Sequence, residues 1–227
     1  MESCNVDFQA ANLGECRIPS PLVGLHFVDD DERVFYFSNP KDAKACLEAG
    51  EEPPSFEVAG PRRMIYFDPS KLKAGIVTCG GLCPGLNDAI RAIVMSLFHH
   101  YGVRTVFGFR YGYEGLSPKH AHAPLELTPD FVRDIHERGG TVLGSSRGPQ
   151  DVSEMVDTLE RMNVGLLFTI GGDGTLRGTQ AMAEEIARRK LKIALIGIPK
   201  TIDNDVPYIE ESFGFETAVT ETRTAIY

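Results

Sequence analysis

The stretch VGLLFTIGGDGTLRG, residues 164–178, decides the fold of this chain. Its continuous apolar run over 164–170 is typical of a strand that is buried on both faces. The run leads into GGDGT at 171–175, and apolar residues at helical spacing then predict a helix over 176–190. A strand, a glycine-rich turn and a helix form the first part of a βαβ unit. The stretch therefore predicts a parallel sheet that is covered by helices.

The same alternation recurs on both sides of this stretch. Three further strands are predicted, over 73–79, 104–109 and 192–198. Four further helices are predicted: one that ends near residue 100, one between the Thr128-Pro129 cap and the Gly139-Gly140 end, one over 153–162, and one from about 216. We therefore expect an α/β fold, a three-layer, open, mainly parallel sheet with helices on both faces.

Residues 1–66 lack the alternation of apolar strands and amphipathic helices that the rest of the chain shows. They hold an acidic run over 29–32, a short apolar stretch over 34–37 and two adjacent prolines at 53–54. We expect an N-terminal extension with one short strand and a short helix near 41–49. We recognise in it no group of residues typical of a catalytic or binding site.

Composition excludes several classes of partner. The chain has 32 Asp and Glu against 23 Lys and Arg, a formal net charge of -9, so we expect neither nucleic acid nor an anionic membrane as a partner. No apolar run reaches the ~18 residues that a membrane span needs, and the first residues do not resemble a secretory signal. The five cysteines show no C-x-x-C spacing and no accompanying histidine cluster, which predicts reduced thiols in a cytoplasmic protein. A metal pair of Cys79 and Cys83 is the alternative.

Polar, glycine-bearing segments follow the predicted strands. In open parallel sheets, ligands bind at the carboxyl ends of the strands. TCGGLCPGLN, at 78–87, offers Gly80, Gly81 and a helix N-terminus to a phosphate, although it matches neither common nucleotide-binding glycine motif, and a plain turn is the alternative. In GGDGT, Asp173 is either a solvated turn residue or a ligand of Mg²⁺ beside nucleotide phosphates.

Two more segments supply charge. PKTIDNDV, at 199–206, holds Lys200, Thr201, Asp203 and Asp205; it is either a hydrophilic loop or a source of a general base and a metal ligand for phosphoryl transfer. GGTVLGSSRG, at 139–148, holds Arg147, which is either a surface arginine or a contact to a transferring phosphoryl group.

With these segments in this order, the chain resembles the phosphofructokinase family. The motifs that carry the resemblance are GGLCPGLNDAIR, GGTVLGSSRG, IGGDGT, PKTIDNDV and SFGFETAV, and they cover roughly residues 66–227. The stretches FVDDDERVFYF and YFDPSKLKAGIVTCGGLCPG are most similar to the plant-type, ATP-using branch. NAD kinases and lipid kinases share GGDGT but not PKTIDND.

The resemblance implies a glycolytic kinase that phosphorylates fructose 6-phosphate, with ATP as donor and Mg²⁺ as cofactor. Arg147 would contact the transferred phosphoryl group, and Asp173 would serve Mg²⁺. The remaining residues implied for ATP binding are Gly80, Gly81, Gly172, Gly174 and Thr175.

The resemblance also implies the acceptor half of the site. Thr201 and Asp203 would meet fructose 6-phosphate, with Asp203 as the base on its 1-hydroxyl group, and Asp205 would support the metal site. Gly174 favours ATP because pyrophosphate users tend to carry Asp there, whereas Lys200 is common in pyrophosphate users. A pyrophosphate-dependent enzyme and a catalytically silent regulatory subunit therefore stay open as alternatives.

The family's pattern continues beyond Tyr227, the last residue. We expect an extension over 1–66 and a nucleotide-binding lobe over 67–227, truncated before the sugar-phosphate lobe. The resemblance further implies an allosteric enzyme that is a homo-oligomer, a tetramer, when full length.

Overall fold

The computed structural model describes residues 8–36, 39–206 and 208–226. The chain divides into two compact units, Met1–Tyr66 and Phe67–Tyr227. Each unit is described by itself. No helix in the described part of the chain is long and apolar enough to cross a membrane.

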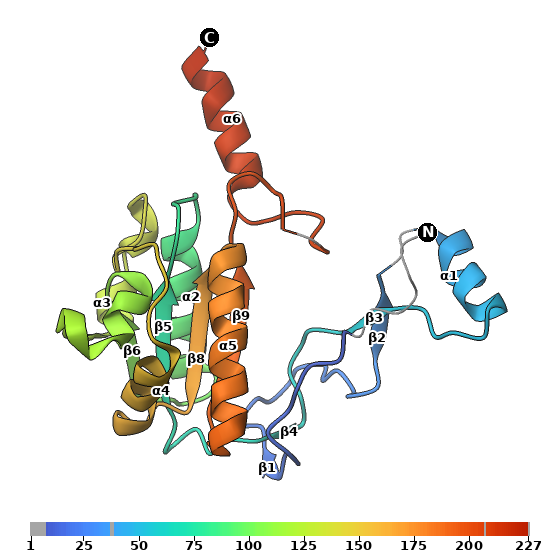
Figure 1. Ribbon diagram of the computed structural model, residues 1–227, viewed down its shortest axis with the longest axis horizontal. Coiled ribbons are helices and arrows are strands. Elements are labelled where there is room, and N and C mark those ends of the chain that lie inside the picture. The colour runs from blue at the N-terminus through green and yellow to red at the C-terminus, as the bar shows by residue number, and fades with distance from the viewer. Residues whose placement is uncertain (1–7, 37–38, 207, 227) are drawn as a thin grey trace. The chain divides into compact units, whose positions relative to one another are not determined.

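The second unit is built on a five-stranded sheet (Figure 1). Its strands stand in the order β7 (Leu125–Glu126), β6 (Thr105–Phe109), β5 (Lys73–Thr78), β8 (Leu166–Gly171) and β9 (Ala194–Pro199). All neighbours are parallel except β6 and β7, which are antiparallel. The predicted α/β fold with a mainly parallel sheet is confirmed, and the short edge strand β7 is the element that the sequence pattern missed.

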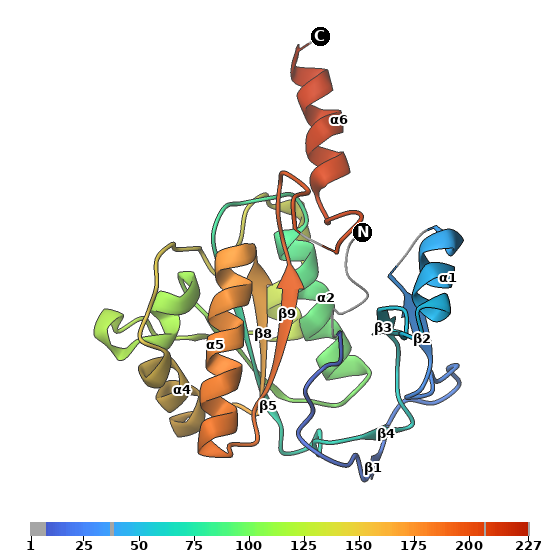
Figure 2. The same cartoon turned by 45° about the vertical axis from the view of Figure 1, so that its right-hand side comes forward.

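Helices cover both faces of this sheet. Alternate residues of β5 belong to different core clusters, because successive side chains of a strand point to opposite faces. Ile76 packs with the cluster that includes α2 (Leu86–His99), and Val77 packs with the cluster that includes α4 (Val152–Arg161) and α5 (Asp173–Arg189). Figures 1 and 2 show α2 on the opposite side of the sheet from α5. The chain therefore forms the three layers that we expected.

Strand order creates a switch point in the middle of the sheet. The chain passes from β5 to its neighbour β6, and then crosses back so that β8 pairs with the other edge of β5. In open α/β sheets, the crevice outside the carboxyl ends of the strands at such a point is where ligands bind. The segments after β5 and β8 are TCGGLCPGLN and GGDGT, so the topology brings the two glycine-rich segments together.

Two predicted helices differ from the structure. The helix expected between Thr128 and Gly139 is broken into α3 (Pro129–Val132) and the 3₁₀ turn η3 (Ile135–Glu137). The Thr128 side chain caps α3 as predicted, by accepting from Phe131 N. Where the helix ends, the Arg133 carbonyl accepts a hydrogen bond from Arg91 Nε of α2 at 3.0 Å. The second difference is that α5 begins at Asp173 rather than at 176, so the last three residues of GGDGT lie in its first turn, after the N-cap Gly172.

The first unit holds short elements. Strand β1 (Ile18–Pro19) pairs with β4 (Met64–Ile65), and β2 (Arg33–Phe35) pairs with β3 (Ser55–Glu57). The predicted short helix is confirmed as α1 (Pro40–Glu48), which the Asn39 side chain caps. Of the predicted strand at 34–37, β2 includes 34 and 35, and residue 37 lies outside the described residues. The last helix, α6 (Phe215–Ile226), belongs to the second unit and has no buried residue among those described.

Three of the five cysteines, Cys16, Cys79 and Cys83, are free thiols, as expected. Cys46 is buried, and Cys4 lies outside the described residues.

A charged network ties α4 to α5. Arg189 Nε donates to Glu185 Oε1 at 2.6 Å, Arg189 Nη2 donates to Ser153 Oγ at 2.6 Å, and Arg189 Nη1 pairs with Asp157. Hydrogen bonds from Arg188 and then Arg189 lower the pKa of Glu185 from 4.5 to about 2. A carboxyl group with a lowered folded-state pKa stabilises the fold above its unfolded pKa and loses that contribution as the pH falls through the folded value.

We predict that Glu185→Gln flattens the loss of stability between pH 4.5 and about 2. The variant is also less stable than wild type near neutral pH, because the ion pairs are gone. Urea unfolding followed by circular dichroism across this range measures both effects. Glu184→Gln is the matched control, since Glu184 accepts from Gln180 and forms no ion pair among the described residues. A Glu185→Gln variant that keeps the acid dependence of wild type contradicts the assignment.

Candidate active site

One cavity of about 810 Å³ opens at the carboxyl ends of β5, β8 and β9. The structure brings together there every site residue singled out from the sequence. They are Gly80, Gly81, Arg147, Gly172, Asp173, Gly174, Thr175, Lys200, Thr201, Asp203 and Asp205.

The turn from β8 into α5 presents backbone amides to this cavity. Gly172 stands at the N-cap in an extended conformation, and no side chain of the described residues caps the helix. The first amide groups of a helix lack intrahelical partners, and they carry the positive end of the helix dipole. A Cβ at Gly171 would lie 2.2 Å from Thr175 Oγ1, so the turn requires glycine there. This end of α5 is therefore shaped to receive an anion.

Lys200 brings a buried cation to the same place. The residue follows β9, is only 5% exposed, and is fixed by its own amide, which donates to the Gly171 carbonyl at 2.9 Å. Its ammonium group donates to the Gly81 carbonyl at 2.5 Å and forms no ion pair among the described residues. Burying an ammonium group without a counter-charge costs several kcal/mol, of the order of the desolvation penalty for one ion. An anion in the cavity would offset that cost.

Arg147 stands beside the other glycine-rich segment. The Ser145 hydroxyl donates to the Gly80 carbonyl at 2.6 Å, and the Gly80 amide donates to the Ser146 carbonyl at 3.1 Å. These bonds fix the arginine loop to the turn after β5. A Cβ at Gly81 would lie 3.6 Å from Arg147 Nη2. The guanidinium group is exposed and has no carboxylate partner among the described residues, so its donors remain available to a phosphate.

The carboxylates differ in how far they are engaged. The Asp173 side chain is 60% exposed and meets only Arg177 Nη2, at 3.6 Å, among the charged groups described. The Thr201 hydroxyl donates to Asp205 Oδ1 at 2.5 Å and accepts from the Asp203 amide at 3.1 Å. The Asp203 carboxylate has no hydrogen-bond partner in the described part of the chain. Asp173 and Asp203 are therefore free to act on a ligand.

The loop that carries Asp203 is braced from its far side. Asn204 adopts a left-handed conformation with φ of 53°, which asparagine tolerates better than most residues. Its side chain accepts from Ser212 N at 2.7 Å and donates to the Glu210 carbonyl at 3.0 Å. The Ser212 hydroxyl then donates to the Thr201 carbonyl at 2.8 Å. These contacts fix the backbone on which Thr201 and Asp203 stand.

Sequence reasoning missed a buried tyrosine that positions the start of α5. The Tyr113 hydroxyl donates to the Thr175 carbonyl at 2.7 Å, and burial raises the pKa of Tyr113 well above its ordinary value. The contact joins residues 62 positions apart, and nothing in the local pattern around Tyr113 marks it.

The thiols in the cavity region are poor metal ligands. Burial raises the pKa of Cys79 to about 11, and burial also raises the pKa of Cys83. Among the described residues, neither thiol belongs to a group of three or more possible metal ligands, so the structure gives the alternative of a metal pair at Cys79 and Cys83 no further ligands.

Comparison with known proteins shows which family the sequence of this chain matches. The family model described as Phosphofructokinase matches residues 73–227. A relative named ATP-dependent 6-phosphofructokinase, from Borreliella burgdorferi, is 48% identical over 98% of this chain and 51% of its own length. This match takes in most of the first unit, where the sequence analysis had found similarity only in FVDDDERVFYF. ATP-dependent 6-phosphofructokinase 7 of Arabidopsis thaliana is 50% identical over 75% of this chain and 35% of its own length.

Among solved structures, the chain is similar to a pyrophosphate-dependent phosphofructokinase from Marinobacter aquaeolei. The TM-score is 0.61 at 21% identity, over 68% of this chain and 41% of that one, which supports the fold alone. The chain spans about half or less of the length of these relatives. The family model covers more than half of the chain, and the relatives include plant isoforms, as the sequence motifs predicted. The chain therefore belongs to the phosphofructokinase family.

Proposed function

We propose that this chain carries the nucleotide half of an ATP-dependent 6-phosphofructokinase site. The γ-phosphoryl group of ATP would pass to the 1-hydroxyl group of D-fructose 6-phosphate, the glycolytic reaction. The observation that carries the proposal is one cavity that combines the buried Lys200, the unpaired Arg147, the start of α5 and free carboxylates. Phosphoryl transfer requires this combination, because catalysis rests on positioning and on neutralising charge.

The phosphates of ATP fit the positive groups. Gly80 and Gly81 allow the backbone to approach, and residues 172–175 offer the amides at the start of α5. Lys200 and Arg147 stand on either side of Gly80 and Gly81, within reach of the same anion. Arg147 is the residue that we assign to the transferring phosphoryl group, since its planar donors match phosphate oxygens.

Asp173 is the residue that we assign to Mg²⁺, with Asp205 in support. The donor set fits this ion, because Asp173 is an open carboxylate at the cavity wall and Mg²⁺ prefers oxygen ligands and substrate phosphates. Bound there, Mg²⁺ would neutralise the charge on the phosphate oxygens.

Asp203 is the residue that we assign as general base. Its free carboxylate would take the proton of the 1-hydroxyl group as that oxygen forms a bond to the γ-phosphorus. The bond from this phosphorus to the β,γ-bridging oxygen breaks, and ADP leaves with the bond's electron pair. The brace through Asn204 and Ser212 holds Asp203 in place for this step.

Gly174 supports ATP as donor rather than pyrophosphate. A Cβ at this position would meet no heavy atom within 4 Å, so the space belongs to the cavity. An aspartate would place a negative charge in that space and repel a nucleotide's α-phosphate, whereas glycine leaves room. Pyrophosphate stays the second candidate as donor because of Lys200. Lysine at this position is common in pyrophosphate users, and a buried ammonium group can bind the phosphates of either donor.

Three wider proposals rest on family resemblance: a cytoplasmic location, allosteric control, and a homo-tetramer for the complete protein. The redox state of the cysteines in protein isolated from cells, measured by differential alkylation, tests the location, because a cytoplasmic location predicts reduced thiols.

We predict that Gly174→Asp weakens the binding of Mg²⁺-ATP by more than ~10-fold, the effect of roughly 1.4 kcal/mol of charge repulsion. Binding of Mg²⁺-pyrophosphate stays near the wild-type value. Isothermal titration calorimetry of the purified chain measures both ligands. Gly139→Asp is the matched control, because a Cβ there also meets nothing within 4 Å and Gly139 does not line the cavity. Wild-type binding of pyrophosphate but not ATP would favour the second candidate, and binding of neither would contradict both.

We predict that Asp203→Ser lowers turnover by ~10²–10⁴-fold, the range for loss of general base catalysis. Affinity for Mg²⁺-ATP changes little, because Asp203 faces the acceptor. A coupled assay of ADP formation with fructose 6-phosphate measures turnover, and calorimetry measures affinity. Near-normal turnover in the variant would exclude Asp203 as the base. ATP binding by wild type with no turnover fits a nucleotide lobe that is assayed without its other half, because this chain spans about half the length of its relatives. Absence of turnover in a full-length context would favour the catalytically silent subunit.

A further inference from the structure

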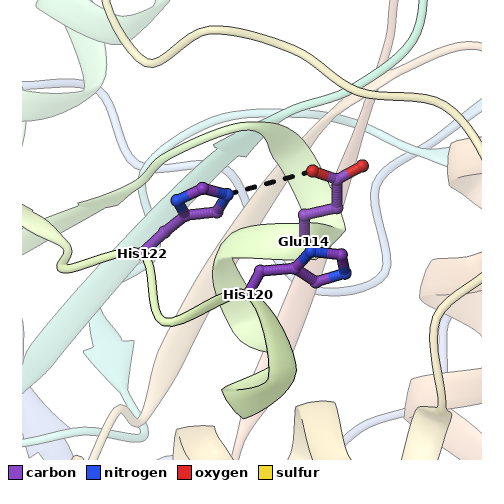
Figure 3. Close-up of side chains that lie close together, drawn as sticks. All are labelled: Glu114, His120 and His122. Atoms are coloured by element: carbon purple, nitrogen blue, oxygen red, sulfur yellow. Dashed lines mark ion pairs between the residues drawn. The ribbon is translucent and has the colours of Figure 1, made fainter.

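A second cluster of ionisable side chains lies outside the cavity described above. Glu114, His120 and His122 each offer a ligand atom, and these atoms all lie within 4.8 Å of one another. Figure 3 shows the three side chains close together, with a dashed line between a His122 ring nitrogen and the Glu114 carboxylate. None of the three lines the nucleotide cavity. We propose that they form a binding site for a divalent transition-metal ion, with Zn²⁺ as the best fit.

Short 3₁₀ turns carry two of the three residues, and His122 lies two residues after the second turn. Glu114 belongs to the 3₁₀ turn η1 (Gly112–Leu116), and His120 ends the 3₁₀ turn η2 (Pro118–His120). Buried Leu116 anchors η1, and a Cβ at Gly115 would lie 2.3 Å from the Arg110 carbonyl, so this turn is tightly packed. The ligands therefore stand on backbone that is already fixed, which lowers the cost of ordering them around an ion.

The two histidines are held in a shared orientation. Ala121, between them, adopts a left-handed conformation with φ of 52°. The two imidazole rings stack, with centroids 5.9 Å apart and planes 9° apart, and the Tyr111 ring packs on His122 at 4.7 Å. The contact with the Tyr111 ring holds His122 beside Glu114, and a turn of the imidazole rings would direct both lone pairs at one ion.

Hydrogen bonding leaves His120 ready to bind a metal. His120 Nε2 lies 3.3 Å from Gln150 Oε1. An amide oxygen only accepts hydrogen bonds, so Nε2 carries the proton and Nδ1 keeps its lone pair. Metal-binding histidines usually donate their other ring N–H to an oxygen in this way. Gln150 would therefore be the outer partner that fixes the His120 tautomer.

The distance between the other two ligands also fits an ion. His122 Nε2 and Glu114 Oε2 are 3.9 Å apart, which is too long for a hydrogen bond. A tetrahedral Zn²⁺ at ~2.0–2.1 Å from each ligand holds its ligand atoms roughly 3.3–3.5 Å apart. Closure of about half an ångström would reach this spacing. The His122 and Glu114 side chains are 29% and 27% exposed, so an ion has access from solvent.

The ligand types select the metal. Imidazole suits Zn²⁺ and its transition-metal neighbours, whereas Mg²⁺ prefers oxygen ligands. Three protein ligands leave one position of a tetrahedral ion for water. The spacing His-x-His in PKHAHAP, six residues after Glu114, is the sequence signal that marks the site, and the sequence analysis did not single it out.

Calorimetry with the full 227-residue chain, stripped by a chelator, tests the proposal. We expect Zn²⁺ binding at one site that His122→Ala weakens by more than ~10-fold, at least the loss typical of removing an outer partner. His100→Ala is the matched control, since His100 is exposed and its ring meets only Ser96 among the described residues. A large excess of Mg²⁺ leaves Zn²⁺ binding unchanged. Circular dichroism checks that each variant stays folded.

Thermal unfolding gives a second readout. Zn²⁺ should raise the melting temperature of wild type and of His100→Ala, but not that of His122→Ala, because only a ligand of the folded state stabilises it. Zn²⁺ binding of equal strength in wild type and His122→Ala overturns the proposal, and so does an equal loss in His100→Ala. Displacement of Zn²⁺ by Mg²⁺ also overturns it.

Discussion

The hydrogen bond from the buried Lys200 ammonium group to the Gly81 carbonyl joins the two halves of the candidate site. It crosses from the segment after β9 to the segment after β5, which are separated by 119 positions in the sequence. The ammonium group has no carboxylate partner in the described part of the chain, so no protein counter-ion balances this positive charge at the cavity wall. The arginine loop, the start of α5 and the Asp203 loop are arranged around this point.

The parts of the fold that rest on apolar pattern could be predicted from the sequence. Strand β5 and strand β8 are continuous apolar runs because both faces of the sheet are covered, and α2 shows the spacing of a helix that buries one side. Elements set by a single tertiary contact could not be predicted. At the break after α3, the Arg91 side chain of α2 contacts the Arg133 carbonyl. The early start of α5 falls in GGDGT, whose glycines are typical of a loop in the sequence.

The candidate site could be predicted because its residues follow strand ends. Parallel strands place their carboxyl ends at one edge of the sheet. The segments that follow β5, β8 and β9 therefore meet at one cavity, and this could be predicted without knowing any contact between residues distant in the sequence. Burial could not be predicted in the same way. Nothing in the sequence separates Lys200, which is 5% exposed, from Arg147, which is exposed, and only the packed structure shows which cation lacks solvent.

The central claim is that the buried ammonium group of Lys200 exists to bind phosphate. The most direct test is to measure, for Lys200→Met and wild type, both the affinity for Mg²⁺-ATP by calorimetry and the free energy of unfolding by urea. Our account predicts that affinity falls by ~10- to 150-fold, the loss of a charge-assisted hydrogen bond of about 1.5–3 kcal/mol. The free energy of unfolding should stay the same or rise, because a buried charge without a counter-ion is removed. A variant that binds ATP normally but unfolds more easily would contradict the claim and make Lys200 a structural residue.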